Sequence, residues 1–277
     1  MGHEADKPTS HPIEWCTHTS NPITGCFHGC PYCYARRAAT RWAHVEKTVY
    51  HRLAVSGVNP FTPAINMDSF RDLEQELRRA RVSRRVFVGS MSDLGGARRW
   101  VRIDGEGPID VCDTIDRRQV VAMFRRLCNG LGWRVPHVLC FLTKAPDGLA
   151  GHWPGAPCRG AWVGVSAKDP EGALWRITTL LRVVTAPVRW LSLEPLGADV
   201  PEGRMLEALE LSRAHELDWI VIGGQTGPGA PSPNVRTARS VVEWAHTQGV
   251  PCFVKANMRR GDTSAVWPTM YPEGGLK

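Results

Sequence analysis

The sequence predicts an α/β fold, a complete or partial (β/α) barrel of about six parallel strands. Short, largely apolar runs recur along the chain, as is typical of strands buried in a parallel sheet. Amphipathic helical patterns separate most of these runs, which indicates βαβ units with right-handed crossovers. A length of 277 residues suits one such domain. The predicted strands occupy 85–89, 138–142, 161–165, 188–193, 219–223 and 251–255.

The N-terminal part of the chain precedes this series of strands. Residues 1–12 are polar, and we expect a disordered lead-in there. Residues 13–16 predict a short first strand, followed by a turn-rich stretch and a loop with three cysteines. Helices are predicted over 34–46 and 67–81, because apolar residues recur there at helical spacing.

Four further helices are predicted between the strands. Two of them carry clear boundary signals. Asp169 precedes Pro170 at the first position of one helix, and Asn234 opens another that Gly249 closes. The four predicted helices occupy 114–129, 170–184, 203–214 and 235–248.

Two segments have no clear period. Residues 95–113 contain Arg98, Arg99 and paired glycines, and we predict an inserted loop that lids the barrel or contacts a phosphate-bearing substrate. Residues 257–277 are rich in glycine, proline and charge and form a C-terminal tail without an assigned role. The barrel domain is therefore expected over 13–256.

The overall charge is strongly basic. The formal net charge is +7, and arginine occurs repeatedly in doublets. Such a balance favours a polyanionic partner, for example a nucleic acid, or a phosphorylated substrate. Arginine-rich helices also commonly form a solvated face, so both interpretations remain open.

The cysteine count and the hydropathy pattern predict a compartment. Nine cysteines are an odd number, and the first residues lack the pattern of a secretory signal. No apolar run approaches the roughly 20 residues of a membrane span. We therefore expect a cytoplasmic protein in a reducing environment without a membrane partner.

Three cysteines in the N-terminal loop are the strongest chemical signal. Cys26, Cys30 and Cys33 have the spacing C-x3-C-x2-C, and soft thiolates at this density select zinc or iron-sulfur. Because a closed site needs four protein ligands, three leave one coordination position free. The alternative is a zinc knuckle whose fourth ligand is Cys16, His18 or His28. No second cysteine pair is present to support it.

The spacing, with Tyr32 just before the last cysteine and Tyr34 just after it, resembles the cluster-binding loop of the radical S-adenosylmethionine (SAM) superfamily. The resemblance implies that Cys26, Cys30 and Cys33 hold a 4Fe-4S cluster whose free iron chelates SAM. Reductive cleavage of SAM then gives a 5'-deoxyadenosyl radical, which abstracts hydrogen from a substrate. It also implies a flavodoxin- or ferredoxin-type electron donor.

Polar residues follow most of the predicted strands, at the end where barrel enzymes place their active sites. The resemblance implies that the segment with Gly89, Ser90 and Asp93 binds the methionine amino group of SAM, with Tyr32 nearby. Ser166, Ser192 and Glu194 are candidates for binding the ribose or the methionyl end of SAM. Gly223 and Gly224 either let a ligand approach the backbone closely or form a tight turn. Lys144 and Lys255 either pair with Glu194 or bind anionic groups of a substrate.

A closer resemblance extends over most of the chain. The sequence is similar to a phage-associated, radical-SAM-like family of unknown function, from which it departs after Asp93 and at 255–257. The association of this family with phages and the net positive charge of the chain favour modification or repair of a nucleotide or nucleic acid. Modification of a peptide or a small metabolite is the other enzymatic option. The non-enzymatic alternative is a zinc-stabilised nucleic-acid-binding protein. The resemblance is carried by 13–15, 21–26, 33–35, 90–93, 142–144, 163–166, 191–196 and 222–230.

Overall fold

The computed structural model describes residues 13–130, 132–153, 158–227, 229–259 and 267–272. The predicted disordered lead-in lies outside these residues, as does most of the C-terminal tail. Of the described residues of the tail, 257–259 belong to a short helix and 267–272 run beside the last strand of the main sheet. There Val254 N donates to Pro268 O, and Met270 N donates to Cys252 O.

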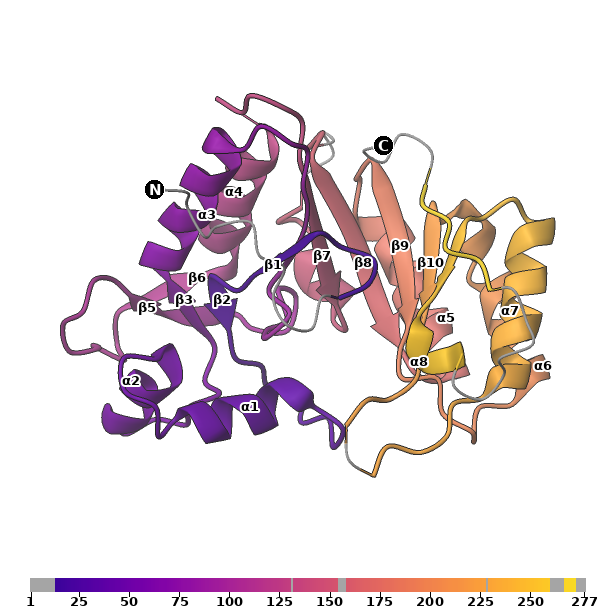
Figure 1. Cartoon of the computed structure of the whole chain (residues 1–277), viewed down its shortest axis with the longest axis horizontal. Helices are drawn as coiled ribbons and strands as arrows, with labels where there is room; N and C mark the ends of the chain where they lie inside the picture. The colour runs from indigo at the N-terminus through magenta and orange to yellow at the C-terminus, as the bar shows by residue number, and fades with distance from the viewer. Residues whose placement is uncertain (1–12, 131, 154–157, 228, 260–266, 273–277) are drawn as a thin grey trace.

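A curled sheet of seven parallel strands forms the centre of the molecule (Figure 1). Its strands lie side by side in chain order, and each described pair is parallel. The sheet curls through half a barrel, which confirms the prediction of a partial barrel with parallel strands. The strands are β1 (His18–Ser20), β4 (Arg85–Val88), β7 (Val138–Thr143), β8 (Ala161–Ala167), β9 (Val188–Leu193), β10 (Trp219–Ile222) and β11 (Cys252–Val254).

The first strand is not where the sequence placed it. Residues 13–16 form a turn, and the strand is β1, which pairs with β4. The prediction was wrong because the apolar residue Trp15 packs into the core from a turn and not from a strand. Its indole is buried against Phe87, Trp190 and Trp219 on the concave face of the sheet.

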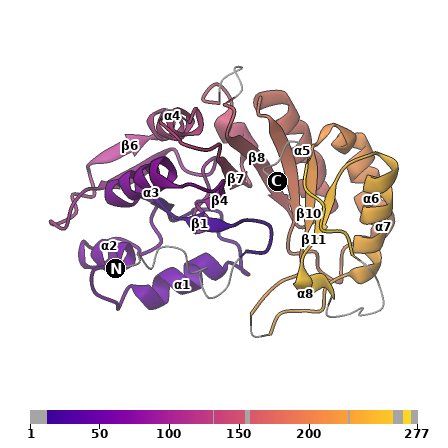
Figure 2. The same cartoon turned by 45° about the horizontal axis from the view of Figure 1, so that its top comes forward.

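The five described helices of ten residues or more cover the convex face of the sheet, as Figures 1 and 2 show. Side chains of Asn66, Asp116, Asp169 and Asn234 cap four of them, so short polar residues set these starts. Their bounds confirm the predicted helices to within a few residues. They are α3 (Met67–Arg79), α4 (Arg117–Cys128), α5 (Pro170–Val183), α6 (Glu202–Leu211) and α7 (Val235–Thr247).

A second, four-stranded sheet corrects the prediction of a structureless loop over 95–113. Strand β5 lies in this segment, with Trp100 and Ile103 buried and Arg99 and Arg102 pointing outward. Exposed and buried residues do not alternate along this strand, because Trp100 is buried on one face while Val101 and Ile103 are buried on the other. The sheet consists of β2 (Ile23–Thr24), β3 (Ala64–Asn66), β5 (Arg99–Ile103) and β6 (Thr114–Asp116).

Three shorter helices complete the described part. Helix α1 (Tyr34–Trp42) ends earlier than the predicted helix over 34–46, while α2 (Val49–Val55) and α8 (Ala256–Arg259) were not predicted. Helix α1 packs through Ala35, Ala38 and Ala39, and its remaining side chains face outward.

The concave face of the half barrel is apolar at one end and polar at the other. Around Trp15, aromatic side chains from five strands, β4, β8, β9, β10 and β11, fill the end at which the strands begin. Gly164 is required there, because a Cβ on it would lie 2.5 Å from the Trp190 indole. At the carboxyl ends of the strands, which we call the mouth, Ser166 and Ser192 are paired neighbours and Lys144 and Glu194 follow. The alternation of strand side chains therefore directs the polar residues into the mouth.

Candidate metal and cofactor site

The cysteine loop connects β2 to α1 and lies at the mouth. Its entry is fixed at Gly25, whose φ of +81° and close approach to Thr62 leave no room for a side chain. Gly25 N donates to Met91 O at 2.9 Å, and Ser92 Oγ donates to Gly25 O at 3.0 Å. The loop is thus tied to the segment that follows β4.

The three cysteines are free thiols that are partly exposed. Cys33 caps α1, and its Sγ accepts a hydrogen bond from Arg36 N at 3.3 Å. The Sγ of Cys26 accepts one from His28 N at 3.4 Å, while burial raises the pKa of the Cys26 thiol to about 11. Cys30 and Cys33, which belong to the same short loop, also raise the pKa of Cys26.

Lys144, from the end of β7, reaches the central cysteine. Its Nζ lies 3.3 Å from Cys30 Sγ and 3.2 Å from the Tyr32 hydroxyl, 4.8 Å from the centre of the Tyr32 ring. Burial alone would lower the pKa of Lys144, but its contacts with Tyr32 and Cys30 raise it. A positive charge therefore lies beside the sulfur of Cys30.

Asp93 is a buried carboxylate that organises the same region. Its Oδ1 accepts hydrogen bonds from Gly95 N, Gly96 N and Thr143 Oγ1, and its Oδ2 accepts one from Lys144 N at 2.7 Å. The Nε2 of His28 lies 2.9 Å from Oδ2. Burial would raise the pKa of Asp93, but these donors lower it below its usual value. With both oxygens engaged, this geometry favours a positioning role over direct contact with SAM.

One group of three potential metal ligands stands out among the described residues. Ligand atoms of Cys26, His28 and Asp93 all lie within 4.8 Å of one another. Of the three residues considered as a fourth zinc ligand, His28 thus lies beside the cysteines. Cys16 belongs to the aromatic cluster around Trp15, and His18 lies on the edge strand β1.

A second charged group lies on the other side of the mouth. Lys255 Nζ and Glu194 Oε2 are 2.7 Å apart, and both side chains are largely buried. Burial would lower the pKa of Lys255, but Glu194 raises it. A Cβ on Gly223 would come within 2.8 Å of the Glu194 carboxyl carbon and 2.9 Å of Lys255 Cδ, so this glycine makes room for the ion pair.

Tyr34 links the cysteine loop to this ion pair. Its hydroxyl donates to Ser90 O at 2.5 Å, and burial of the hydroxyl raises the pKa of Tyr34. The charges of Lys255 and Glu194 also act on this hydroxyl, and Tyr34 directly follows Cys33 in the chain. Tyr34 therefore connects the cysteine loop with the side of the mouth that carries the ion pair.

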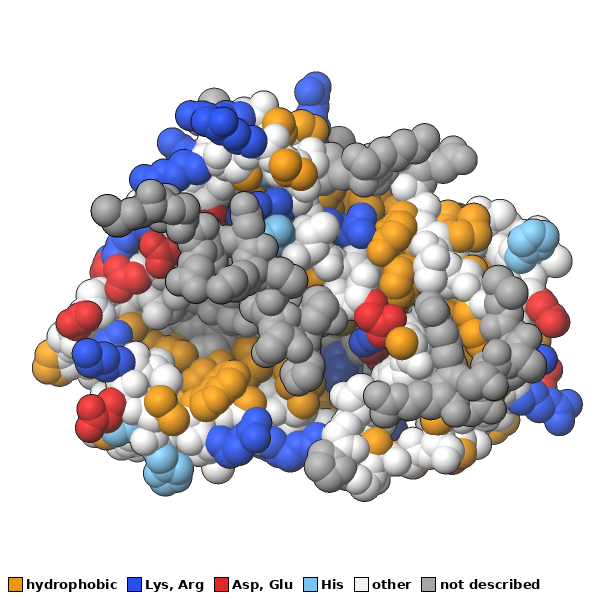
Figure 3. Space-filling model, viewed as in Figure 1, with side chains coloured by type: hydrophobic (Ala, Val, Ile, Leu, Met, Phe, Trp, Pro, Cys, Tyr) orange, Lys and Arg blue, Asp and Glu red, His pale blue; other side chains and the backbone are white. Residues whose placement is uncertain are grey.

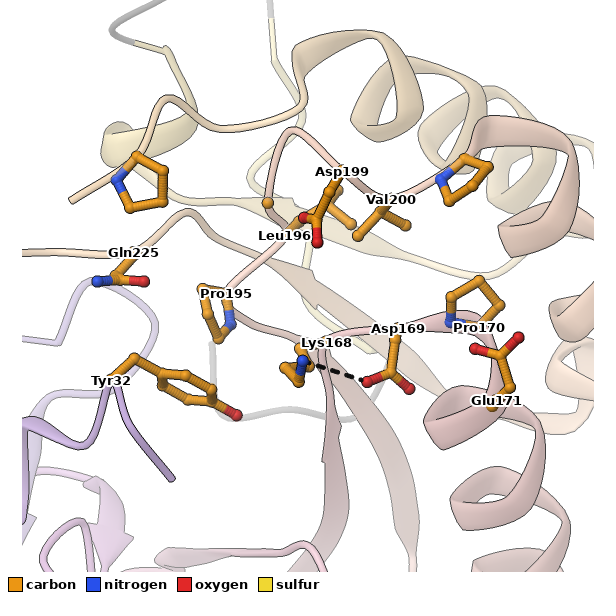
Figure 4. A pocket seen from close by; sticks show the side chains of 13 residues that line it. Tyr32, Lys168, Asp169, Pro170, Glu171, Pro195, Leu196, Asp199, Val200 and Gln225 are labelled. Carbon is orange, nitrogen blue, oxygen red and sulfur yellow. Dashed lines mark ion pairs between the residues drawn. The ribbon is translucent and has the colours of Figure 1, made fainter. Parts of the chain in front are cut away.

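A pocket of about 280 Å³ opens beside this site (Figure 4). Tyr32 and Gln225 lie on one side of it, and the start of α5 with Lys168, Asp169 and Glu171 on the other. The segment from Pro195 to Pro201 supplies apolar walls. Its lining thus combines apolar residues with four charged ones, because Asp199 joins Lys168, Asp169 and Glu171 there.

The remaining predicted site residues fall into three groups. Gly89 has a φ of +75° and turns the chain into Ser90, whose hydroxyl donates to Asn21. Ser166 and Ser192 are buried on neighbouring strands, and Ser166 Oγ donates to Glu194 O. Gly224 is held by two hydrogen bonds with the Asn257 side chain.

The two predicted arginines lie elsewhere in the fold. Arg99 is on the exposed side of β5, with Nη1 3.2 Å from Thr114 Oγ1, and Arg98 is an exposed residue that precedes this strand. Within the described residues, their recorded contacts connect them to the second sheet rather than to the cysteines.

Several site residues were not assigned from the sequence. Thr143 completes the bonds of Asp93, and Asn21 and Asn257 fix backbone at the mouth. The contact of His28 with Asp93 was likewise not predicted, because the sequence indicated His28 only as a possible zinc ligand. Only their position near a strand end or a cysteine could have drawn attention to them. Their hydrogen-bond partners lie 33 to 70 residues away along the chain.

Comparison with known proteins names a family but no activity. No curated protein and no solved structure matches the chain. Among the described residues, no helix is long and apolar enough to cross a membrane. A family model described as a protein of unknown function (DUF5131) matches residues 10–264. The match spans the cysteine loop, the half barrel and the mouth, and the chain therefore belongs to the DUF5131 family.

Proposed function

We propose that the protein is a radical SAM enzyme that binds a 4Fe-4S cluster and cleaves SAM reductively. The observation that carries the proposal is the position of the three free cysteines. They share one loop at the mouth of a half barrel of parallel strands, beside a pocket and two lysine-centred polar groups. This is the end of the strands at which barrel enzymes carry out chemistry.

The donor set fits such a cluster. Cys26, Cys30 and Cys33 are partly exposed, whereas five of the other six cysteines are buried and Cys112 lies on the second sheet's connecting loop. Three thiols without a fourth leave one metal position for a ligand other than protein. When bound, the cluster would supply the electron that breaks the sulfonium bond of SAM.

The residues around the cysteines are proposed to position the cysteine loop and to bind SAM. The Lys144 ammonium offsets the negative charge of the thiolates, and Asp93 fixes the backbone of Lys144 and the ring of His28. Glu194 and Lys255 offer opposite charges to the amino and carboxylate groups of SAM. The pocket beside Tyr32 is the proposed place for its nucleoside part, and Gln225, which follows Gly223 and Gly224 in the chain, lines this pocket.

Partners and location follow from this chemistry. We propose a flavodoxin- or ferredoxin-type electron donor, a nucleotide or nucleic acid as substrate, and a cytoplasmic location. A reducing compartment keeps nine free cysteines reduced and protects an oxygen-sensitive cluster.

One observation favours a second candidate function. Cys26, His28 and Asp93 could hold zinc, which would make the protein a zinc-stabilised nucleic-acid-binding module. The bonds already made by both Asp93 oxygens weigh against a carboxylate ligand at this site.

The test is anaerobic reconstitution with iron and sulfide, followed by reduction with dithionite in the presence of SAM. We expect iron and sulfide near four each per chain and formation of 5'-deoxyadenosine. Cys30→Ala should abolish both, and Cys112→Ala, an exposed cysteine outside the loop, should keep both. A colourless protein that retains zinc and yields no 5'-deoxyadenosine would establish the zinc module instead.

A further inference from the structure

One face of α1 carries a row of cationic and aromatic side chains that leads into the mouth. Tyr34, Arg37 and Arg41 are spaced i, i+3 and i+7, so they share one stripe of this nine-residue helix. All three are exposed, and the helix contains no acidic residue. Figure 3 shows Lys and Arg side chains gathered along the lower edge of the molecule, over α1.

The direction of this stripe follows from contacts at two of its residues. The Tyr34 hydroxyl is held at Ser90 O and feels the charges of Glu194 and Lys255. Arg37 Nη2 lies 3.7 Å from where a Cβ on Gly227 would be, so Arg37 reaches the loop after β10. The stripe therefore runs along the mouth toward the cysteines, facing the opposite half of the fold.

The arginines of the stripe are available for an external anion. Neither Arg37 nor Arg41 is recorded in an ion pair or a side-chain hydrogen bond within the described residues, whereas Arg71, Arg204 and Arg236 elsewhere each pair with carboxylates. Arg41 lies in the last turn of α1, where a cation also complements the helix dipole, but this does not account for Arg37.

Aromatic side chains accompany the cations. Phe27, within the cysteine loop, is 69% exposed, and Tyr34 and Trp42 are 50% and 41% exposed at the two ends of α1. Exposed aromatic rings next to arginines are the elements with which proteins bind single-stranded nucleic acids, by stacking bases and pairing phosphates. An acidic protein partner would satisfy the arginines but gives no reason for rings along the same path.

From these observations we infer that the Tyr34–Arg37–Arg41 stripe, with Phe27 and Trp42, binds the backbone and bases of a single-stranded nucleic acid and guides it to the mouth. This inference rests on the proposed function and specifies its substrate as a polynucleotide. Arg37 and Arg41 are about 6 Å apart along the helix axis, enough for each to contact a separate phosphate.

The test is fluorescence anisotropy with a labelled single-stranded DNA 20-mer and an RNA of the same sequence, using the full chain without iron or SAM. We expect Arg37→Ala/Arg41→Ala to weaken binding roughly tenfold and to reduce the slope of log affinity against log salt by about 1.4, since each lost phosphate contact contributes about 0.7. The matched control is Arg118→Ala/Arg126→Ala, which removes the same charge from exposed positions on α4. It should change affinity less than twofold. Unchanged thermal unfolding of both variants would confirm that each is folded.

Three outcomes would overturn the inference. They are no salt-dependent binding by the unaltered chain, equal losses in both double variants, and unchanged binding in the α1 variant. If the α1 variant binds unchanged and, after separate reconstitution of the cluster, is reduced more slowly by an acidic flavodoxin, the stripe is assigned to a protein electron donor. Nucleic-acid binding is measured without cofactors, so its absence would not affect the result of the 5'-deoxyadenosine assay. Absence of 5'-deoxyadenosine would likewise leave the binding result unchanged.

Discussion

At the scale of single residues, the site depends on buried charges that have well-defined partners. Asp93 illustrates this, because its carboxylate accepts bonds from three backbone amides, a hydroxyl and a histidine. Its charge is favoured at neutral pH since the pKa lies below the usual 3.8. The stabilising contribution is present above that usual value and is lost as the pH falls through the lower pKa of the folded state.

Replacing Asp93 by Asn tests its positioning role. The amide would turn a donor toward groups that are themselves donors, so we expect a loss of about 3 kcal/mol in the free energy of unfolding and reduced iron loading. Urea denaturation and iron analysis measure the two effects. Asp104→Asn, at an exposed carboxylate paired with Arg71, should change neither appreciably. Similar behaviour of the two variants would show that Asp93 has no special role.

At the scale of elements, the mouth is assembled from the ends of strands that are adjacent in space. The segment after β9 contributes Glu194, the one after β10 contributes Gly223, and the one after β11 contributes Lys255. The parallel register between these strands places the three residues together. The Glu194–Lys255 ion pair therefore depends on the absence of a side chain at position 223 as well as on its two charges.

Gly223→Ala tests this arrangement of strand ends. The new methyl group would displace the Glu194–Lys255 pair, since it would meet both side chains at under 3 Å. We expect a stability loss of about 1–3 kcal/mol and weaker SAM binding by calorimetry. Gly203→Ala, in α6 with open space around it, is the control and should be neutral or slightly stabilising. Unimpaired SAM binding by Gly223→Ala would exclude the ion pair from the cofactor site.

At the scale of the whole molecule, the half barrel does not close on itself, and an aromatic cluster fills its inner base. Trp15 precedes β1 yet inserts among Trp190, Trp219 and Phe87 from three strands. This packing joins the N-terminal segment to β4, β9 and β10, so the cysteine loop that follows is held against the sheet.

Trp15→Ala should therefore act on global stability. We expect a loss of about 3–5 kcal/mol in the free energy of unfolding and a weaker near-ultraviolet dichroism signal, because a large buried side chain leaves a cavity. Chemical denaturation followed by tryptophan fluorescence measures the first. Trp175→Ala, at a ring that is 48% exposed on α5, should cost under about 0.5 kcal/mol. Equal effects would contradict the role of the cluster.

The sequence by itself determined the parallel α/β fold, five of the long helices and the loop of three cysteines. These are local properties: apolar runs, capping residues and short spacing carry them. Tertiary structure decided the rest. The strand in 95–113 exists because Trp100 and Ile103 are buried on its two opposite faces, and the position of Trp15 depends on rings from distant strands. The ties of Asp93 to His28 and Thr143, and of Lys144 to Cys30, join residues 50 to 114 positions apart. No local pattern encodes such contacts, because only the packing of parallel strands brings their ends to one mouth.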